Sequence, residues 1–164
     1  MTPSTPANVY RPRIQRRFAT RVLASWAAVD AVLNALQPVL SLMARLYVAQ
    51  IFFASGLTKL RDWGTTLALF VDEYRVPLLS PGVAAILGTG GELVLPVLLA
   101  AGLFGRFAAL GLLVVNGVAV ISLAEIAPTA LQQHMTWGVL LAALSVFGCG
   151  RWALDNPLRA WMAR

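Results

Sequence analysis

Hydrophobic residues gather into long runs along this chain instead of alternating with polar ones. Four apolar windows are bounded by polar or charged residues and cover residues 39–60, 83–104, 107–124 and 134–148. An α-helix rises about 1.5 Å per residue, so about 20 residues cross a hydrocarbon core of about 30 Å. The pattern therefore predicts four membrane-spanning helices, of which the last needs flanking residues to span.

The segments outside these windows predict three smaller regions. Residues 1–21 hold five arginines and no acid, and are expected to form a mobile basic tail and not a secretory signal. Residues 22–37 are mostly apolar and carry Asp30 and Asn34 four apart on one helical face. That arrangement suits an amphipathic helix in the membrane interface, with a fifth spanning helix as the alternative. Residues 156–164 form a short tail.

Composition agrees with a membrane protein. Hydrophobic residues make up 59% of the 164 positions, charged residues 12%, and mean hydropathy is +0.73. These values lie outside the usual range of soluble domains. The predicted fold is all-α, an integral membrane four-helix bundle over residues 38–155 with an N-terminal interfacial helix.

The distribution of basic residues predicts orientation, because lysine and arginine accumulate on the cytoplasmic side. Nine basic residues fall on the side of both termini, and three fall on the other: Lys59, Arg61 and Arg75. We therefore expect both termini to be cytoplasmic. The net charge of +6 is explained by topology and by attraction to anionic lipids, so no nucleic-acid partner is needed.

Glu92 lies in the middle of the second window, where an ionisable group is costly and is commonly functional. Counting along the helices places Gln50 and Asn116 at the same depth, with Arg45 near enough to reach toward the carboxylate. Glu92 is therefore a candidate proton-handling residue for a quinone-like ligand. The alternative is a structural Arg45–Glu92 pair, with Asn116 as a clamp between helices. Arg45 and Gln50 are five apart, so they cannot both face Glu92.

His134, the sole histidine, opens the fourth window and is expected to form a second cluster at the outer surface with Lys59, a candidate ligand-binding residue. It is a candidate catalytic residue, able to exchange protons near neutral pH or to bind a quinone carbonyl. The alternative is an interfacial histidine that caps its helix. One histidine and the single distant Cys149 supply no ligand pair for a metal. Cys149 is expected to be a small packing residue, with a reactive thiol as the alternative.

Three sequence features resemble the DoxX family over residues 43–155. Arg45 precedes a hydrophobic run that ends in Ser55, Gly56 and Lys59. The stretch GTGGELVLPVLLAAGLFGRFAAL contains Glu92 and a Gly-Leu-x-x-Arg turn ending at Arg106, and GCGRWALD ends at Asp155. The loop EYRVPLLSP is similar to a subgroup found beside maturation enzymes of copper-binding modified peptides.

The resemblance implies a compact four-helix membrane protein. Some family members are subunits of quinone-linked oxidoreductases, so we expect this chain to lie in the bacterial inner membrane. No Walker loop, CxxC motif or histidine pair for haem is present. At most, then, we expect an oxidoreductase subunit without its own redox cofactor, passing reducing equivalents between a partner and the quinone pool.

Two alternatives remain open at this point. One is a membrane anchor or scaffold whose external loop, residues 61–81, docks a membrane or periplasmic protein. The other is a small metallophore-related transporter, which would need a homo-oligomer to enclose an aqueous path.

Overall fold

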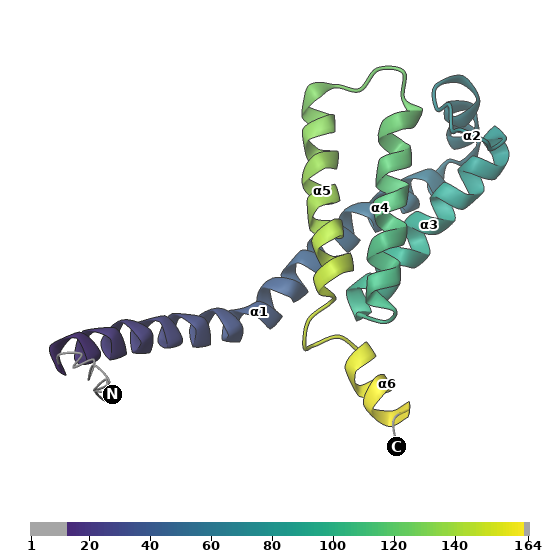
Figure 1. The fold of residues 1–164 in the computed structure, drawn as a ribbon. Coiled ribbons are helices and arrows are strands. Elements are labelled where there is room, and N and C mark those ends of the chain that lie inside the picture. The colour runs from purple at the N-terminus through teal and green to yellow at the C-terminus, as the bar shows by residue number, and fades with distance from the viewer. Residues whose placement is uncertain (1–12, 163–164) are drawn as a thin grey trace, which may run out of the picture. The chain divides into compact units, whose positions relative to one another are not determined.

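The computed structural model describes the backbone of residues 13–162 and the side chains of residues 23–162. The chain divides into two compact units, Met1–Gln37 and Pro38–Arg164. The described residues form α1 (Arg13–Arg61), α2 (Trp63–Asp72), α3 (Pro81–Ala101), α4 (Gly105–Ser122), α5 (Pro128–Phe147) and α6 (Asp155–Met162) (Figure 1). The expected all-α fold is confirmed.

In the first unit, the described backbone is helical from Arg13 onward. All side chains from residue 23 to residue 37 are exposed, including the large apolar ones of Leu23, Trp26 and Leu33. Residues 1–12 of the expected basic tail lie outside the described residues, whereas residues 13–21 are helical. The location of this segment in the membrane interface stays a prediction, and α1 continues through Pro38 without ending there.

Three of the described helices are long and apolar enough to cross a membrane: residues Leu23–Arg61 of α1, and all of α3 and α4. The protein is therefore a multi-pass membrane protein. The fourth expected window lies in α5, which has 20 residues but carries Thr129, Gln132, Gln133 and His134 in its first two turns. These polar side chains lower its hydropathy, so a membrane crossing by α5 stays a prediction.

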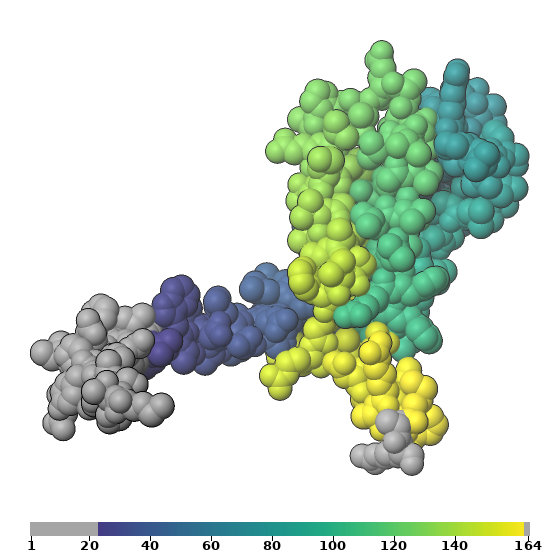
Figure 2. Space-filling view, in the orientation of Figure 1, coloured from purple at the N-terminus to yellow at the C-terminus, as the bar shows by residue number. Residues whose placement is uncertain are grey.

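Within the second unit, α4 packs against both α3 and α5 (Figures 1 and 2). Fully buried Val48, Leu99, Leu112 and Leu141 bring α1, α3, α4 and α5 into one apolar core. Large apolar side chains such as Val94, Val114 and Val139 remain exposed on the outside of these helices. An apolar exterior around an apolar core is what a bilayer requires.

Helix α2 lies within the segment that the sequence predicted as an external loop, so that prediction is corrected. The Asp62 carboxylate accepts a hydrogen bond from the backbone N–H of Thr65 at 3.0 Å, which caps the helix and lowers the pKa of Asp62. Phe70 then packs against Ala84 and Ala85 of α3. A ten-residue helix is therefore stabilised by its cap and by tertiary packing.

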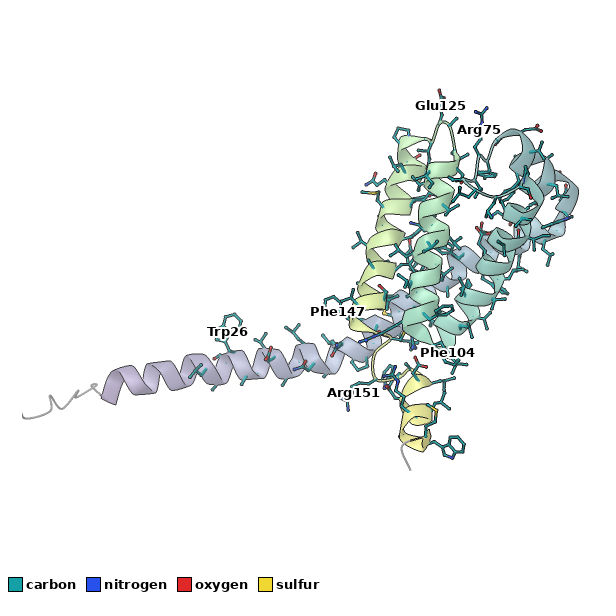
Figure 3. The ribbon with its side chains drawn as sticks, turned by 45° about the vertical axis from the view of Figure 1, so that its right-hand side comes forward. Trp26, Arg75, Phe104, Glu125, Phe147 and Arg151 are labelled. Atoms are coloured by element: carbon teal, nitrogen blue, oxygen red, sulfur yellow. The ribbon has the colours of Figure 1, made fainter. Side chains whose placement is uncertain are left out.

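The loop between α2 and α3 is attached to the end of α4. The backbone N–H of Arg75 donates to the carbonyl of Ser122 at 2.9 Å, and Tyr74 pairs with Leu123 in an isolated antiparallel bridge. Figure 3 shows Arg75 and Glu125 together at this end of the unit, and Phe104, Phe147 and Arg151 toward the opposite end. We call these the Arg75 end and the Phe104 end.

At the Phe104 end, a tight turn joins α3 to α4. Gly102 adopts a left-handed conformation with φ of 69°, which glycine reaches without steric penalty. Asp155, at the start of α6, accepts hydrogen bonds from the backbone N–H groups of Phe104 at 2.8 Å and Gly105 at 3.0 Å. The carboxylate therefore caps the N-terminus of α4 from a distant part of the sequence.

Candidate functional site

A buried ion pair joins α1 to α3. The ammonium of Lys59 lies 2.5 Å from Oε2 of Glu92 and also donates to the hydroxyl of Ser55 at 3.0 Å. The Glu92 side chain is 9% exposed and that of Lys59 is 21% exposed. The pair therefore lies mostly inside the protein, where charges interact more strongly than in water.

The expected pairing of Glu92 with Arg45 is wrong, and close packing at Gly56 explains the difference. A Cβ atom at Gly56 would lie 3.1 Å from the backbone carbon of Glu92, so the two helices approach closely at this point. Lys59 is one helical turn further along α1 and lies on the same face as Gly56. Its four-carbon side chain is long enough to reach the carboxylate.

An apolar cavity of about 210 Å³ adjoins this ion pair. Phe70 of α2, the α2–α3 loop, α3 and α4 form its walls. The lining residues are Lys59, Phe70, Tyr74, Val76, Leu79, Ala84, Leu87, Gly88, Glu92, Val114, Val115, Val118, Ala119 and Ser122. We call this space the α2–α4 cavity.

Few polar groups of the α2–α4 cavity are available to a ligand. The hydroxyl of Ser122 already donates to the carbonyl of Val118 at 2.5 Å. Leu87 and Val114 line the cavity and are also more than half exposed on the outer surface. The cavity is therefore a mostly apolar space with one buried ion pair. Two of its lining side chains, Leu87 and Val114, also reach the lipid-facing surface.

Asn116 lies with His134 and not with Glu92. The side-chain amide nitrogen of Asn116 donates to the carbonyl of His134 at 3.0 Å, and its Oδ1 lies 2.8 Å from Nδ1 of the His134 ring. Because the amide nitrogen is used by the carbonyl, Oδ1 acts as the acceptor and Nδ1 carries the proton. Nε2 of the ring is left as an acceptor.

This contact links α4 to α5. A Cβ atom at Gly138 would lie 3.3 Å from the Asn116 amide nitrogen, so glycine provides the room for it. The His134 ring also meets Trp137 edge to face, with 5.0 Å between the ring centroids. Asn116 and His134 thus have the geometry of an interhelical clamp, while the catalytic role of His134 stays a prediction.

Arg45 and Gln50 lie away from the ion pair. Arg45 is 1% exposed, and its guanidinium packs against the turn at Gly102. Gln50 is exposed beside Phe53 and Pro96 on a shallow surface depression. The sequence placed Gln50, Glu92 and Asn116 in one polar layer, but the structure places them at separate sites. Residues at the same depth can point in different directions around their helices.

Sequence reasoning missed Tyr74 and Gly88 as cavity residues. Tyr74 is placed by the bridge to Leu123, which no local pattern indicates. Gly88 has no side chain to mark it in the sequence, and a Cβ atom there would lie 3.6 Å from the Phe70 ring. Among the side chains that the structure describes, no group of three or more histidine, cysteine, aspartate or glutamate residues is placed to hold a metal ion.

A model of the DoxX family matches residues 40–125, slightly more than half of the chain. The matched range contains all the residues that line the α2–α4 cavity, and it ends before His134. No curated protein and no solved structure matches the chain. On the strength of the family match, this chain belongs to the DoxX family.

Proposed function

We propose that this protein is an accessory redox subunit of the bacterial inner membrane that binds a quinone in the α2–α4 cavity. In this role it serves the passage of reducing equivalents between a partner oxidoreductase and the quinone pool. The observation that carries the proposal is the buried Lys59–Glu92 pair beside an apolar cavity whose walls extend to the lipid-facing surface. Both termini are proposed to lie in the cytoplasm.

The size and polarity of the cavity fit a quinone head group. An apolar protein cavity of about 150 Å³ can hold a benzene ring, so about 210 Å³ is enough for a substituted ring. A quinone adds oxygen atoms on opposite sides of the ring, together with an apolar tail. The walls at Leu87 and Val114 give that tail a route toward lipid.

Lys59 and Glu92 supply complementary polar groups at one end of this space. The Lys59 ammonium can donate a hydrogen bond to a ring oxygen, and Glu92 can accept one from a ring hydroxyl. A bound quinone supplies two-electron, two-proton redox chemistry. Glu92 would hold a proton at Oε1, because Oε2 accepts from the Lys59 ammonium, and Lys59 would keep the carboxyl group oriented, while the apolar walls exclude water.

The partner oxidoreductase would supply or accept the electrons, because the sequence carries no motif for a haem or a dinucleotide. A partner can reach the Arg75 end of the protein, where Leu78 is fully exposed in the α2–α3 loop. This loop also contributes Tyr74, Val76 and Leu79 to the cavity wall. Docking there would bring the partner close to the bound ring.

Quinone binding to Gly88 and Gly90 variants tests the proposal. Gly88→Leu places a side chain in the cavity, whereas a Cβ atom at Gly90 meets nothing within 4 Å. Binding of a short-chain quinone to the purified protein should weaken by at least about tenfold in Gly88→Leu, corresponding to about 1.4 kcal/mol, and remain unchanged in Gly90→Leu. Equal affinity for both variants, or no binding to the wild type, would contradict the proposal.

A further inference from the structure

The short helix α6 carries an apolar face that none of the described residues buries. Leu158, Trp161 and Met162 recur at the spacing of one helical face, and Leu154 extends that face by one turn before the helix begins. No residue of α6 is buried, and Trp161 is 74% exposed. We call these four side chains the α6 apolar face. A helix of eight residues is only marginally stable alone in water, so burial of this face would stabilise it.

Helix α6 begins directly at the ends of two helices that can cross the membrane. The backbone N–H of Leu154 donates to the carbonyl of Ala101 at 3.3 Å, and that of Asp155 donates to the carbonyl of Gly102 at 3.0 Å. The Asp155 carboxylate also caps α4. Because α3 and α4 are long and apolar enough to span the bilayer, the place where they meet marks the membrane boundary. The first turn of α6 therefore lies at that boundary.

Exposed aromatic residues surround this start of α6. Phe104 and Phe147 lie at the same end of the unit (Figure 3), and both are exposed. Trp152, in the segment that leads into α6, is exposed as well. Tryptophan is enriched at the level of the lipid head groups, where its ring is partly in acyl chains and its N–H is near water. The apolar surface of the spanning helices thus continues onto α6.

The charge at the Phe104 end is basic. Arg106, Arg151 and Arg159 are exposed, and the Arg106 guanidinium lies against Gly148, just before Arg151 in the chain. Asp155 is the only acidic residue after Glu125 in the sequence, and its carboxylate is already used as the cap of α4. Guanidinium groups bind phosphate oxygens through paired hydrogen bonds. The surface that complements this end is therefore apolar and negatively charged.

We propose that α6 is an anchor that lies in the interface of a bilayer containing anionic phospholipids. The α6 apolar face enters the boundary of the acyl chains, and Arg151 and Arg159 bind lipid phosphate groups. An amphipathic helix with tryptophan and leucine on one face and arginine outside it is typical of this position. The segment expected from sequence to be a short tail would then fix the depth of α3 and α4 in the membrane. This inference is independent of the proposed quinone site.

A fluorescent label on α6 tests the position of the helix. The label is attached at Met162→Cys in full-length protein whose buried Cys149 is replaced by alanine. Ala160→Cys is the matched control, because residue 160 is about 160° around the helix from both Leu158 and Met162. The purified protein is reconstituted into vesicles of phosphatidylcholine and phosphatidylglycerol, and quenching by lipid-attached nitroxides gives the depth of each label.

A helix with its side chains is about 10 Å across, so the label at residue 162 should lie roughly 10 Å deeper in the bilayer than the label at residue 160. Equal depths would overturn the proposal. A label at residue 162 that lies in water would do the same, as would one that a second copy of the chain shields from both water and lipid.

Nitroxides on different head groups test the charge of the lipid. Around the label at residue 162, phosphatidylglycerol should be enriched over phosphatidylcholine by at least about fivefold, which corresponds to about 1 kcal/mol for a basic residue at a membrane surface. Arg151→Gln combined with Arg159→Gln should remove most of this enrichment, whereas Arg75→Gln at the opposite end should leave it unchanged. Equal quenching by the two lipids, or an enrichment that the loss of both arginines does not change, would overturn the proposal.

Discussion

A double-mutant cycle on Lys59 and Glu92 measures how strongly the ion pair holds α1 to α3. Removing one partner of a buried pair leaves an unpaired charge and costs about 3–5 kcal/mol, whereas removing both is often nearly neutral. The lower end applies here because Lys59 is 21% exposed. We therefore expect about 3 kcal/mol for Lys59→Met or Glu92→Gln alone, and about 1 kcal/mol for the double variant.

Melting temperatures in a single detergent provide the assay. At about 2–4 °C per kcal/mol for a chain of this size, each single variant should melt about 6–12 °C below the wild type. The double variant should recover most of that loss. Leu60→Met, at an exposed neighbouring position, should change little. Strictly additive effects of the two substitutions would refute the reasoning, because they would show that the two charges do not interact in the folded protein.

Three further substitutions test individual contacts. Gly102→Ala should lower the free energy of unfolding by at least about 2 kcal/mol, because φ is 69° and the added Cβ would lie 2.7 Å from Ala153. Gly117→Ala is the control: an added Cβ there meets open space, so the change should be neutral or stabilising by up to about 1 kcal/mol. Asn116→Ala should lower the free energy of unfolding by about 1 kcal/mol, because it removes both hydrogen bonds to His134. A melting temperature within about 1 °C of the wild type would count against the clamp. Asp155→Ala should cost about 1–2 kcal/mol by uncapping α4, with faster amide hydrogen exchange in its first turn as the specific readout; unchanged exchange there would show that the cap is not needed.

Hydrophobic run length predicted three of the four expected spans, in α1, α3 and α4, because the bilayer sets a required length and leaves few alternatives to a helix. The same criterion did not predict helix α2, and it did not predict that α5 begins with polar residues. Helix α2 has only ten residues, and its stability comes from the Asp62 cap and from Phe70 packing on α3. That packing partner is distant in sequence, so a local pattern does not show it.

The candidate site was predicted in part. Glu92 was correctly expected to be buried with a basic partner, but Arg45 was chosen over Lys59. Helical rise gives the depth of a residue, whereas the pairing depends on which faces of two helices meet. That choice is made at Gly56, where α1 packs closely against the backbone of α3, and one sequence without structural information does not show it.

Photoaffinity labelling with an azido-quinone tests the central claim most directly, because it reports where a quinone lies in the folded protein. The account predicts covalent modification within α3 and α4 at the α2–α4 cavity, near Leu87, Val114 and Val118, and loss of that modification in Gly88→Leu. Labelling confined to other helices, or labelling of the cavity helices that persists unchanged in Gly88→Leu, would contradict the account.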